Sequence, residues 1–387
     1  MADDSEPIHV LLDSCIYRAD RKRSKSGFRA LVRLARAGYV QLHVPAYVKG
    51  EVITQQQHDV AADINSLKSA ADAILRTTDE IHLQQHAKSV EATVEAMKAS
   101  SADWLATEFD KWLSNVDAIV HPVKPHHAKL VTDAYFEGKV PFRAPKHRPD
   151  IPDAFIWQVA LDLAKEHGKI VVISTDGRLR ETAAKHDAMT VYKTLEEFIE
   201  IPHCQELLRD LVSDIITDNL DHLKRSLPRL TKAMKKPVEQ ALAKALVGHV
   251  VKHDAIPDDN HEAFILDVEE LNDLTFDTDD IDYYGAADFG INFTATLDCR
   301  VNYSIFKGDY YSLDDEIMSD ISVDERNDHY FDAEQTFNIS VQAAAGIVID
   351  TSMLEKDGLT YQDLTDIITQ ATFSIDIIST TVNVPLW

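Results

Sequence analysis

Two aspartates come directly after apolar runs of the kind that form buried strands. Asp13 follows the run at 8–12, and Asp176 follows the run at 170–174. In an open parallel sheet, ligands bind outside the carboxyl ends of the strands, near the point where the strand order reverses. An acid that ends a buried strand is poorly explained by stability, because burying a charge is costly. Both residues are therefore candidates for a functional site.

Glu51 and Asp153 are expected at the same edge of the sheet. Glu51 lies one to two turns into a helix that follows the apolar run at 40–44. Asp153 lies in the first turn of a helix that leads down to the next strand. The catalytic group that we expect to converge from these distant segments comprises Asp13, Glu51, Asp153 and Asp176.

Converging carboxylates require a cation. Two carboxylates ~4 Å apart repel each other by roughly 4 kcal/mol at an effective dielectric constant near 20. Oxygen ligands suit Mg²⁺ and Mn²⁺, and these ions activate water and stabilise a leaving oxyanion on phosphorus. No histidine, lysine or cysteine stands out as an alternative catalytic group. The acids therefore predict phosphodiester hydrolysis with Mg²⁺ or Mn²⁺ as cofactor.

A structural interpretation stays open for part of this set. With 65 acidic residues in the chain, any single acid is weak evidence. Asp150 and Asp153 flank Pro152, as the N-cap residue and the first-turn acid of a helix commonly do. On that interpretation Asp150 stabilises the helix by about 0.5–2 kcal/mol, and Asp153 complements the helix dipole.

Strand patterns alternate with helical patterns over the first half of the chain. The strand-like runs lie at 8–12, 40–44, 116–120, 170–174 and 189–192. This alternation predicts an α/β fold with a doubly wound, mostly parallel sheet in residues 1–200. The polar stretch 54–113 is too long for an ordinary connection and has helical periodicity, so we expect a helical insertion there.

The net charge of −26 is unevenly distributed. Residues 1–257 contain 35 basic and 36 acidic residues, whereas residues 258–387 contain 4 and 29. We assign 201–257, which has a helical pattern, to a connector and 258–387 to an acidic, β-rich α+β domain. Its expected elements are antiparallel strands within 290–306, 335–350 and 372–384 and a helix near 360–369.

The acidic domain is expected to contact a protein instead of a nucleic acid. A surface so negative repels phosphate over the ~8 Å Debye length of physiological salt. We therefore expect self-association or a protein partner there, with solubilisation as the plain alternative.

The three cysteines and the absence of targeting signals favour a cytoplasmic protein. The cysteines are far apart and form no metal-ligand array, so we expect reduced thiols. The acidic N-terminus is unlike a secretory signal, and no apolar run approaches the ~20 residues that span a bilayer. No membrane partner is expected.

Several short strings resemble the motifs of a known family. They are Val-Leu-Leu-Asp-Ser-Cys (10–15), Val-Pro-Ala-Tyr-Val-Lys-Gly-Glu-Val (44–52), Tyr-Phe-Glu-Gly-Lys-Val-Pro-Phe (135–142), Asp-Ile-Pro-Asp-Ala-Phe-Ile-Trp (150–157) and Val-Ile-Ser-Thr-Asp-Gly (172–177). In this order they resemble a bacterial PIN-like subfamily of PIN-domain ribonucleases, over residues 8 to about 195. The long insertion and the β-rich C-terminal domain depart from the core PIN fold.

The resemblance implies a nuclease that uses Mg²⁺ or Mn²⁺, usually against single-stranded RNA. By position, the same four acids would be its catalytic and metal-binding residues, with Asp150 as an auxiliary metal ligand. It also implies that Ser14, Ser174 and Thr175 are hydrogen-bonding neighbours that help to bind the substrate.

Basic residues flank the acids and are candidates for binding RNA phosphates. The expected substrate contacts are Arg18, Arg21, Lys22, Arg23, Arg148 and Arg178. A solvated loop surface is the alternative interpretation of these residues.

Two other functions stay open at this stage. One is a structure-specific DNA nuclease in which the helical insertion threads a strand. The other is a catalytically silent PIN-fold module that binds proteins. Comparing the cleavage of single-stranded RNA with that of flapped DNA tests the first alternative. Stabilisation by Mn²⁺ tests the second, because a silent module should show none.

Overall fold

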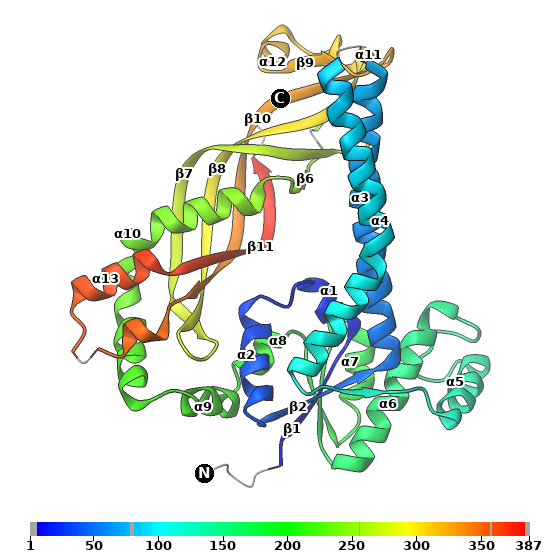
Figure 1. Cartoon of the computed structure of the whole chain (residues 1–387), viewed down its shortest axis with the longest axis vertical. Coiled ribbons are helices and arrows are strands. Elements are labelled where there is room, and N and C mark those ends of the chain that lie inside the picture. The colour runs from blue at the N-terminus through cyan, green and yellow to red at the C-terminus, as the bar shows by residue number, and fades with distance from the viewer. Residues whose placement is uncertain (1–5, 78–80, 255, 357, 384–387) are drawn as a thin grey trace. The chain divides into compact units, whose positions relative to one another are not determined.

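A computed structural model describes residues 6–77, 81–254, 256–356 and 358–383. The chain divides into two compact units, Met1–Leu207 and Leu208–Trp387. Figure 1 colours the chain by residue number, from blue at the N-terminus to red at the C-terminus. None of the described helices combines the length and the apolar character needed to cross a membrane.

The first unit contains a parallel five-stranded sheet. Its strands are β1 (Ile8–Leu12), β2 (Val40–Pro45), β3 (Ile119–His121), β4 (Ile170–Ile173) and β5 (Met189–Tyr192). They lie in the order β3-β2-β1-β4-β5, and every neighbouring pair is parallel. The predicted doubly wound sheet is therefore confirmed. The strand order reverses between β1 and β4, which is where such sheets place their ligands.

Helices connect these strands. Besides the insertion they are α1 (Ser14–Ala19), α2 (Ser26–Arg36), α5 (Pro125–Glu137), the 3₁₀ turn η1 (Arg148–Asp150), α6 (Ile151–His167) and α7 (Gly177–Ala183). Two more helices, α8 (Leu195–Ile199) and α9 (Pro202–Asp210), follow β5. Helix α6 packs against β2 and β4, and α2 packs against β2 and α8. The apolar residues of β1 and β4 are almost completely buried, because helices cover both faces of a doubly wound sheet.

The stretch predicted as a helical insertion forms a long antiparallel pair of helices. They are α3 (Ala46–Thr77) and α4 (Ile81–Asn115), with residues 78–80 outside the described part. The pair extends away from the sheet in Figure 1. At its base, Phe109 and Trp112 pack edge-on against Tyr17. Because α3 also contains Glu51, the insertion begins as a continuation of the helix that carries this acid.

The second unit is an antiparallel sheet packed against a long helix. Its strands are β6 (Val250–Lys252), β7 (Glu262–Tyr283), β8 (Asp288–Phe306), β9 (Ser322–Glu325), β10 (Tyr330–Val348) and β11 (Thr372–Asn383). Its helices are α10 (Asp214–Leu246), α11 (Lys307–Tyr310), α12 (Asp315–Ser319), η2 (Thr351–Leu354) and α13 (Tyr361–Gln370). The predicted β-rich domain is confirmed. The last residue of the strand expected at 372–384 lies outside the described residues.

Helix α10 belongs to the core of the second unit. Its apolar residues recur every three or four positions, which gives the helix one apolar face. The buried residues are Ile216, Leu220, Leu223, Leu227, Leu230, Met234, Val238, Leu242 and Leu246. The helix packs against β7, β11 and α13. The segment that the sequence assigned to a connector therefore lies mostly inside the second unit, whose boundary falls within α9.

Candidate functional site

Asp13 lies at the carboxyl end of β1, as the N-cap residue of α1. Its side chain is 5% exposed. The backbone N–H of Ser14 donates to Asp13 Oδ1 at 2.6 Å, and the hydroxyl of Ser174 donates to Oδ2 at 2.6 Å. The thiol of Cys15 also donates to Oδ2, at 3.2 Å. These bonds satisfy a buried carboxylate and hold it in one orientation.

Ser174 connects the acids of β1 and β4. While it donates to Asp13, its hydroxyl oxygen accepts a hydrogen bond from the backbone N–H of Asp176 at 3.0 Å. Asp176 in turn caps α7, because its Oδ1 accepts from the backbone N–H of Leu179 at 2.8 Å. One buried serine therefore sets the positions of two acids from neighbouring strands.

Glu51 is brought to the same edge by α3. Burial raises the pKa of Glu51, and so does the negative charge of Asp13, whereas a hydrogen bond from Ser14 and the charge of Arg18 act to lower it. The first turns of α3 and α6 meet where the rings of Tyr47 and Phe155 stack, with centroids 4.4 Å apart. This stacking holds the helix of Glu51 beside the helix of Asp153.

Asp153 experiences the negative charge of all the other acids. Burial, followed by the charges of Asp13, Asp176, Glu51 and Asp150, raises the pKa of Asp153 from 3.8 to about 7. Because the charges of the other three predicted acids act on Asp153, the four acids that the sequence singled out lie in one neighbourhood of the sheet edge.

A small apolar cluster packs around Ala154, the residue that follows Asp153 in α6. Val131 of α5 and Phe142 of the loop after it pack against Ala154 of α6. Gly138 ends α5 with a φ of 67°, and a Cβ there would lie 2.7 Å from Pro145 Cδ. Only glycine fits this close approach without strain. The loop can then return to the start of α6.

Asp150 anchors this loop. Its side chain is 2% exposed, and Oδ2 accepts from the backbone N–H of Arg143 at 2.7 Å. His147 Nδ1 lies 2.9 Å from the same oxygen, and Arg178 Nη1 lies 3.9 Å away. Because the guanidinium groups of Arg143 and Arg178 lie against this carboxylate and would repel a cation, we assign Asp150 a positioning role in place of metal ligation.

The donor set of the four acids fits a hard cation. Among the described residues, two groups of three ligands lie within 4.8 Å of one another; both contain histidines, and neither contains these acids. The oxygens of the four acids are therefore not gathered as closely as 4.8 Å, and mutual repulsion of like charges favours this separation. Oxygen ligands with excess negative charge are nevertheless what Mg²⁺ or Mn²⁺ binds, and a cation relieves the repulsion seen at Asp153.

The comparison with known protein families agrees with this geometry. Residues 10–178 match the family model of the PIN domain. The first unit carries a PIN domain. No curated protein and no solved structure matches the chain. PIN domains are generally nucleases and typically bind divalent metals, so the PIN domain supports a hydrolase acting on nucleic acids.

The basic residues expected around the PIN-domain acids have different environments. Arg18, Lys22 and Arg148 are exposed. Arg21 is also exposed, but it pairs with Asp59 at 2.8 Å.

Three of the predicted substrate contacts have structural roles in the PIN domain. The Arg23 guanidinium lies over the rings of Phe109 and Trp112, at 5.0 and 5.2 Å, and Arg178 binds the loop of Asp150. Ser174 is 0% exposed, and its hydroxyl is used by the two aspartates. We therefore leave Arg23, Arg178 and Ser174 out of the substrate surface. Long-range packing, which the local sequence does not reveal, is the reason in each case.

Two glutamines near Glu51 were not singled out from the sequence. A hollow beside the PIN-domain acids is lined by Ser14, Arg18, Glu51, Gln55 and Gln56, among others. Gln56 Nε2 donates to the carbonyl oxygen of Arg21 at 3.1 Å. Because Gln55 is four residues after Glu51, helical spacing was the available signal. The hollow offers amide groups beside a carboxylate, as binding of a polar substrate requires.

Proposed function

We propose that this chain is a Mg²⁺- or Mn²⁺-dependent endoribonuclease that hydrolyses single-stranded RNA in the cytoplasm. The observation that carries the proposal is the pKa of Asp153, which burial and four neighbouring acids raise to about 7. Perturbed pKa values of this kind cluster at functional sites. The PIN domain supplies the nuclease-type fold, and the similarity of its motifs to those of PIN ribonucleases supports RNA as the substrate.

Asp13, Glu51, Asp153 and Asp176 would hold the metal ion in this proposal. Bound there, the ion would activate a water molecule and stabilise the leaving oxyanion. The protein's own task is to place the ligands. Ser174 fixes Asp13 and Asp176 relative to each other, while the packing of α3 against α6 places Glu51 and Asp153.

The RNA backbone would lie along exposed groups around these acids. Arg18 borders the hollow beside Glu51, and Lys22 is exposed after α1. Arg148 and the side chain of Thr175 are exposed on the segments that lead to Asp153 and Asp176. Basic side chains bind phosphates without reading sequence, so these contacts would position RNA and leave its sequence unspecified.

Cleavage of a labelled single-stranded RNA by purified protein tests the proposal. We expect cleavage that requires Mg²⁺ or Mn²⁺ and is abolished in Asp13→Asn, because the amide keeps the volume and removes the charge. Asp187→Asn is the matched control, since Asp187 is an exposed acid just before β5, at the opposite edge of the sheet. Full activity of Asp13→Asn, or undiminished cleavage in excess chelator, would refute the mechanism.

The same assay separates the alternative functions. A structure-specific DNA nuclease would prefer a flapped DNA to single-stranded RNA. A silent protein-binding module would cleave neither substrate and would not be stabilised by Mn²⁺.

The second unit is proposed to mediate self-association or to bind a protein partner. Its 29 acidic against 4 basic residues over 258–387 support this role, because that charge disfavours a direct contact with RNA. It would also compete with RNA for the basic residues around the nuclease site.

A further inference from the structure

A cluster of histidines lies on the sheet of the first unit, away from the carboxylates. In the register of the parallel strands, Leu11 of β1 is opposite His43 of β2, and Pro45 of β2 is opposite His121 of β3. Because side chains alternate along a strand, His9, His43 and His121 lie diagonally across one face. His167, the last residue of α6, covers this face, and its ring stacks on His9 with centroids 3.7 Å apart.

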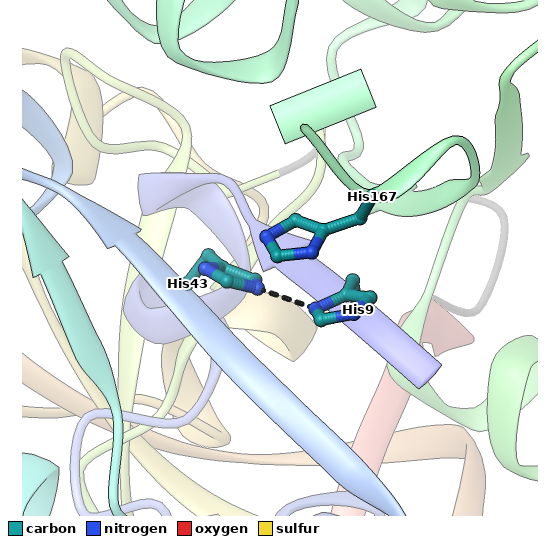
Figure 2. A group of neighbouring side chains, drawn as sticks. All are labelled: His9, His43 and His167. Atoms are coloured by element: carbon teal, nitrogen blue, oxygen red, sulfur yellow. Dashed lines mark hydrogen bonds between the residues drawn. The ribbon is translucent and has the colours of Figure 1, made fainter. Parts of the chain in front are cut away.

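The ring nitrogens of His9, His43 and His167 lie close enough together to be considered as ligands of a single ion. Their ligand atoms all lie within 4.8 Å of one another, and Figure 2 shows His167 above the pair formed by His9 and His43. His9 Nδ1 and His43 Nε2 are 2.9 Å apart. Two nitrogens on a tetrahedral Zn²⁺ are separated by about 3.3 Å, given Zn–N bonds of about 2.0–2.1 Å. To admit the ion, this hydrogen-bonded contact would have to open, and the ring of His167 would have to turn out of its stack on His9, because a metal ion lies in the plane of each imidazole that binds it.

Two of the three rings have a side chain beside their second nitrogen. His43 Nδ1 lies 2.9 Å from His121 Nε2. His9 Nε2 is buried, has no hydrogen-bond partner among the described residues, and lies 3.7 Å from Glu6 Oε1. A histidine that binds a metal typically directs its second nitrogen to a carboxylate, a carbonyl oxygen or water, which fixes the tautomer and the ring orientation. Glu6 could serve His9 in this way, and His121 would orient His43.

Imidazole nitrogens are the ligands of ions such as Zn²⁺, whereas Mg²⁺ prefers oxygen ligands.

We propose that His9, His43 and His167 form a Zn²⁺ site that ties the end of α6 to β1 and β2. The site is separate from the carboxylates, because His9 and Asp13 are four residues apart on an extended strand, about 13 Å. Three histidines leave the fourth position to water or another ligand. The ion would stabilise the first unit, and the proposal does not depend on the nuclease function.

A second histidine group serves as an internal control. His126 and His127 lie within 4.8 Å of Asp162 in the other three-residue group. There, however, Lys124 Nζ donates to Asp162 Oδ2 at 2.7 Å, and His127 Nε2 lies 3.0 Å from the same oxygen. An ammonium group already neutralises the carboxylate, so this group is a poorer cation site.

Zinc titration of the full-length, chelator-treated protein in millimolar Mg²⁺ tests the proposal, with Co²⁺ absorption as a measure of tetrahedral coordination. We expect one tight Zn²⁺ per chain and a Zn²⁺-dependent rise in melting temperature. His121→Ala should weaken binding by about 10–100-fold, the usual effect of losing an outer partner. His167→Ala should weaken it further, whereas His126→Ala should bind as the parent does.

Each contrary result overturns the proposal. Parent-like zinc affinity in a folded His167→Ala variant would remove His167 from the site, and loss of binding in His126→Ala would move the site to the second group. If the bound Zn²⁺ disappears in Asp13→Asn, the ion belongs to the carboxylates. Absence of stoichiometric Zn²⁺ in the parent would exclude the site. Because His167 is a half-buried helix-terminal residue, its alanine variant is expected to fold, and the His121→Ala titration provides an independent check.

Discussion

Replacing Asp153 by asparagine should stabilise the metal-free protein while it abolishes cleavage. The pKa of Asp153 is about 7 in the folded protein, against 3.8 for an ordinary aspartate. Because the raised pKa favours the protonated form, ionisation of Asp153 costs folding stability. That cost is absent below pH 4, grows between pH 4 and pH 7, and is complete above pH 7.

The size of the effect follows from the shift. Three pKa units correspond to roughly 4 kcal/mol at about 1.4 kcal/mol per unit. Asp153 is half-buried, and solvent screening reduces the cost, so we expect about 1–3 kcal/mol. The amide keeps the volume of the side chain and does not ionise. Asp153→Asn should therefore equal the parent in stability near pH 4 and exceed it by this amount at pH 8.

Urea unfolding in excess chelator, followed by tryptophan fluorescence, measures this difference. Trp104, Trp112 and Trp157 lie in the first unit, so the signal reports mainly on the unit that contains Asp153. Ionisable groups far from Asp153 are common to both proteins and cancel in the comparison, whereas the neighbouring acids are coupled to Asp153 and contribute to the measured difference. Saturating Mg²⁺ should raise the stability of the parent at pH 8 and have little effect on the variant.

Two outcomes would refute this reasoning. One is an Asp153→Asn variant that is less stable than the parent at pH 8. The other is a stability difference that does not change between pH 4 and pH 8, which would mean that Asp153 does not ionise against its neighbours. Asp187→Asn, which removes an exposed acid at the opposite edge of the sheet, is the matched control.

Three further predictions concern the loop, the basic surface and the second unit. Asp150→Ala should destabilise the protein by about 1–3 kcal/mol, because it leaves the Arg143 N–H without its acceptor; a large loss of turnover with unchanged stability would instead make Asp150 a ligand. Replacing Arg18, Lys22 and Arg148 with alanine should flatten the log-log salt dependence of RNA binding by about 0.7 per lost phosphate contact, and an unchanged slope would identify ordinary solvated surface. Chains ending at Leu207 should lose self-association and cleave RNA faster at low salt, and a match to the full-length protein in mass, rate and salt response would leave only a solubilising role for the second unit.

The sequence was sufficient to predict the layered architecture of both units. Strands buried between helices are mostly apolar on both faces, and the runs at β1, β2 and β4 have this character apart from His9, Gln41 and His43. Antiparallel strands with one buried face alternate, as in β8 and β10. Asp13 and Asp176 were predicted as site residues for a related reason, because a charged residue at the end of an apolar strand interrupts the pattern. Glu51 and Asp153 were predicted from their places in the first turns of helices at the same edge.

The partners of individual side chains depended on the tertiary structure. Arg23 lies in a basic run, yet it packs over Phe109 and Trp112, which are contributed by the last turns of α4 at the base of the helical pair. Ser174 lies near predicted site residues, but its hydroxyl is used to align two aspartates. No local pattern distinguishes these roles, because each depends on a residue more than eighty positions away or on burial by another element.

The histidine cluster shows this difference most clearly. Its members come from β1, β2, β3 and the end of α6, and no two of them share a motif spacing. The sequence determined that a doubly wound sheet forms and where its strands end, because hydrophobic periodicity is a local signal. Only the strand register and the packing of α6 decided that these histidines meet on one face, because those depend on contacts between segments separated by up to 158 positions.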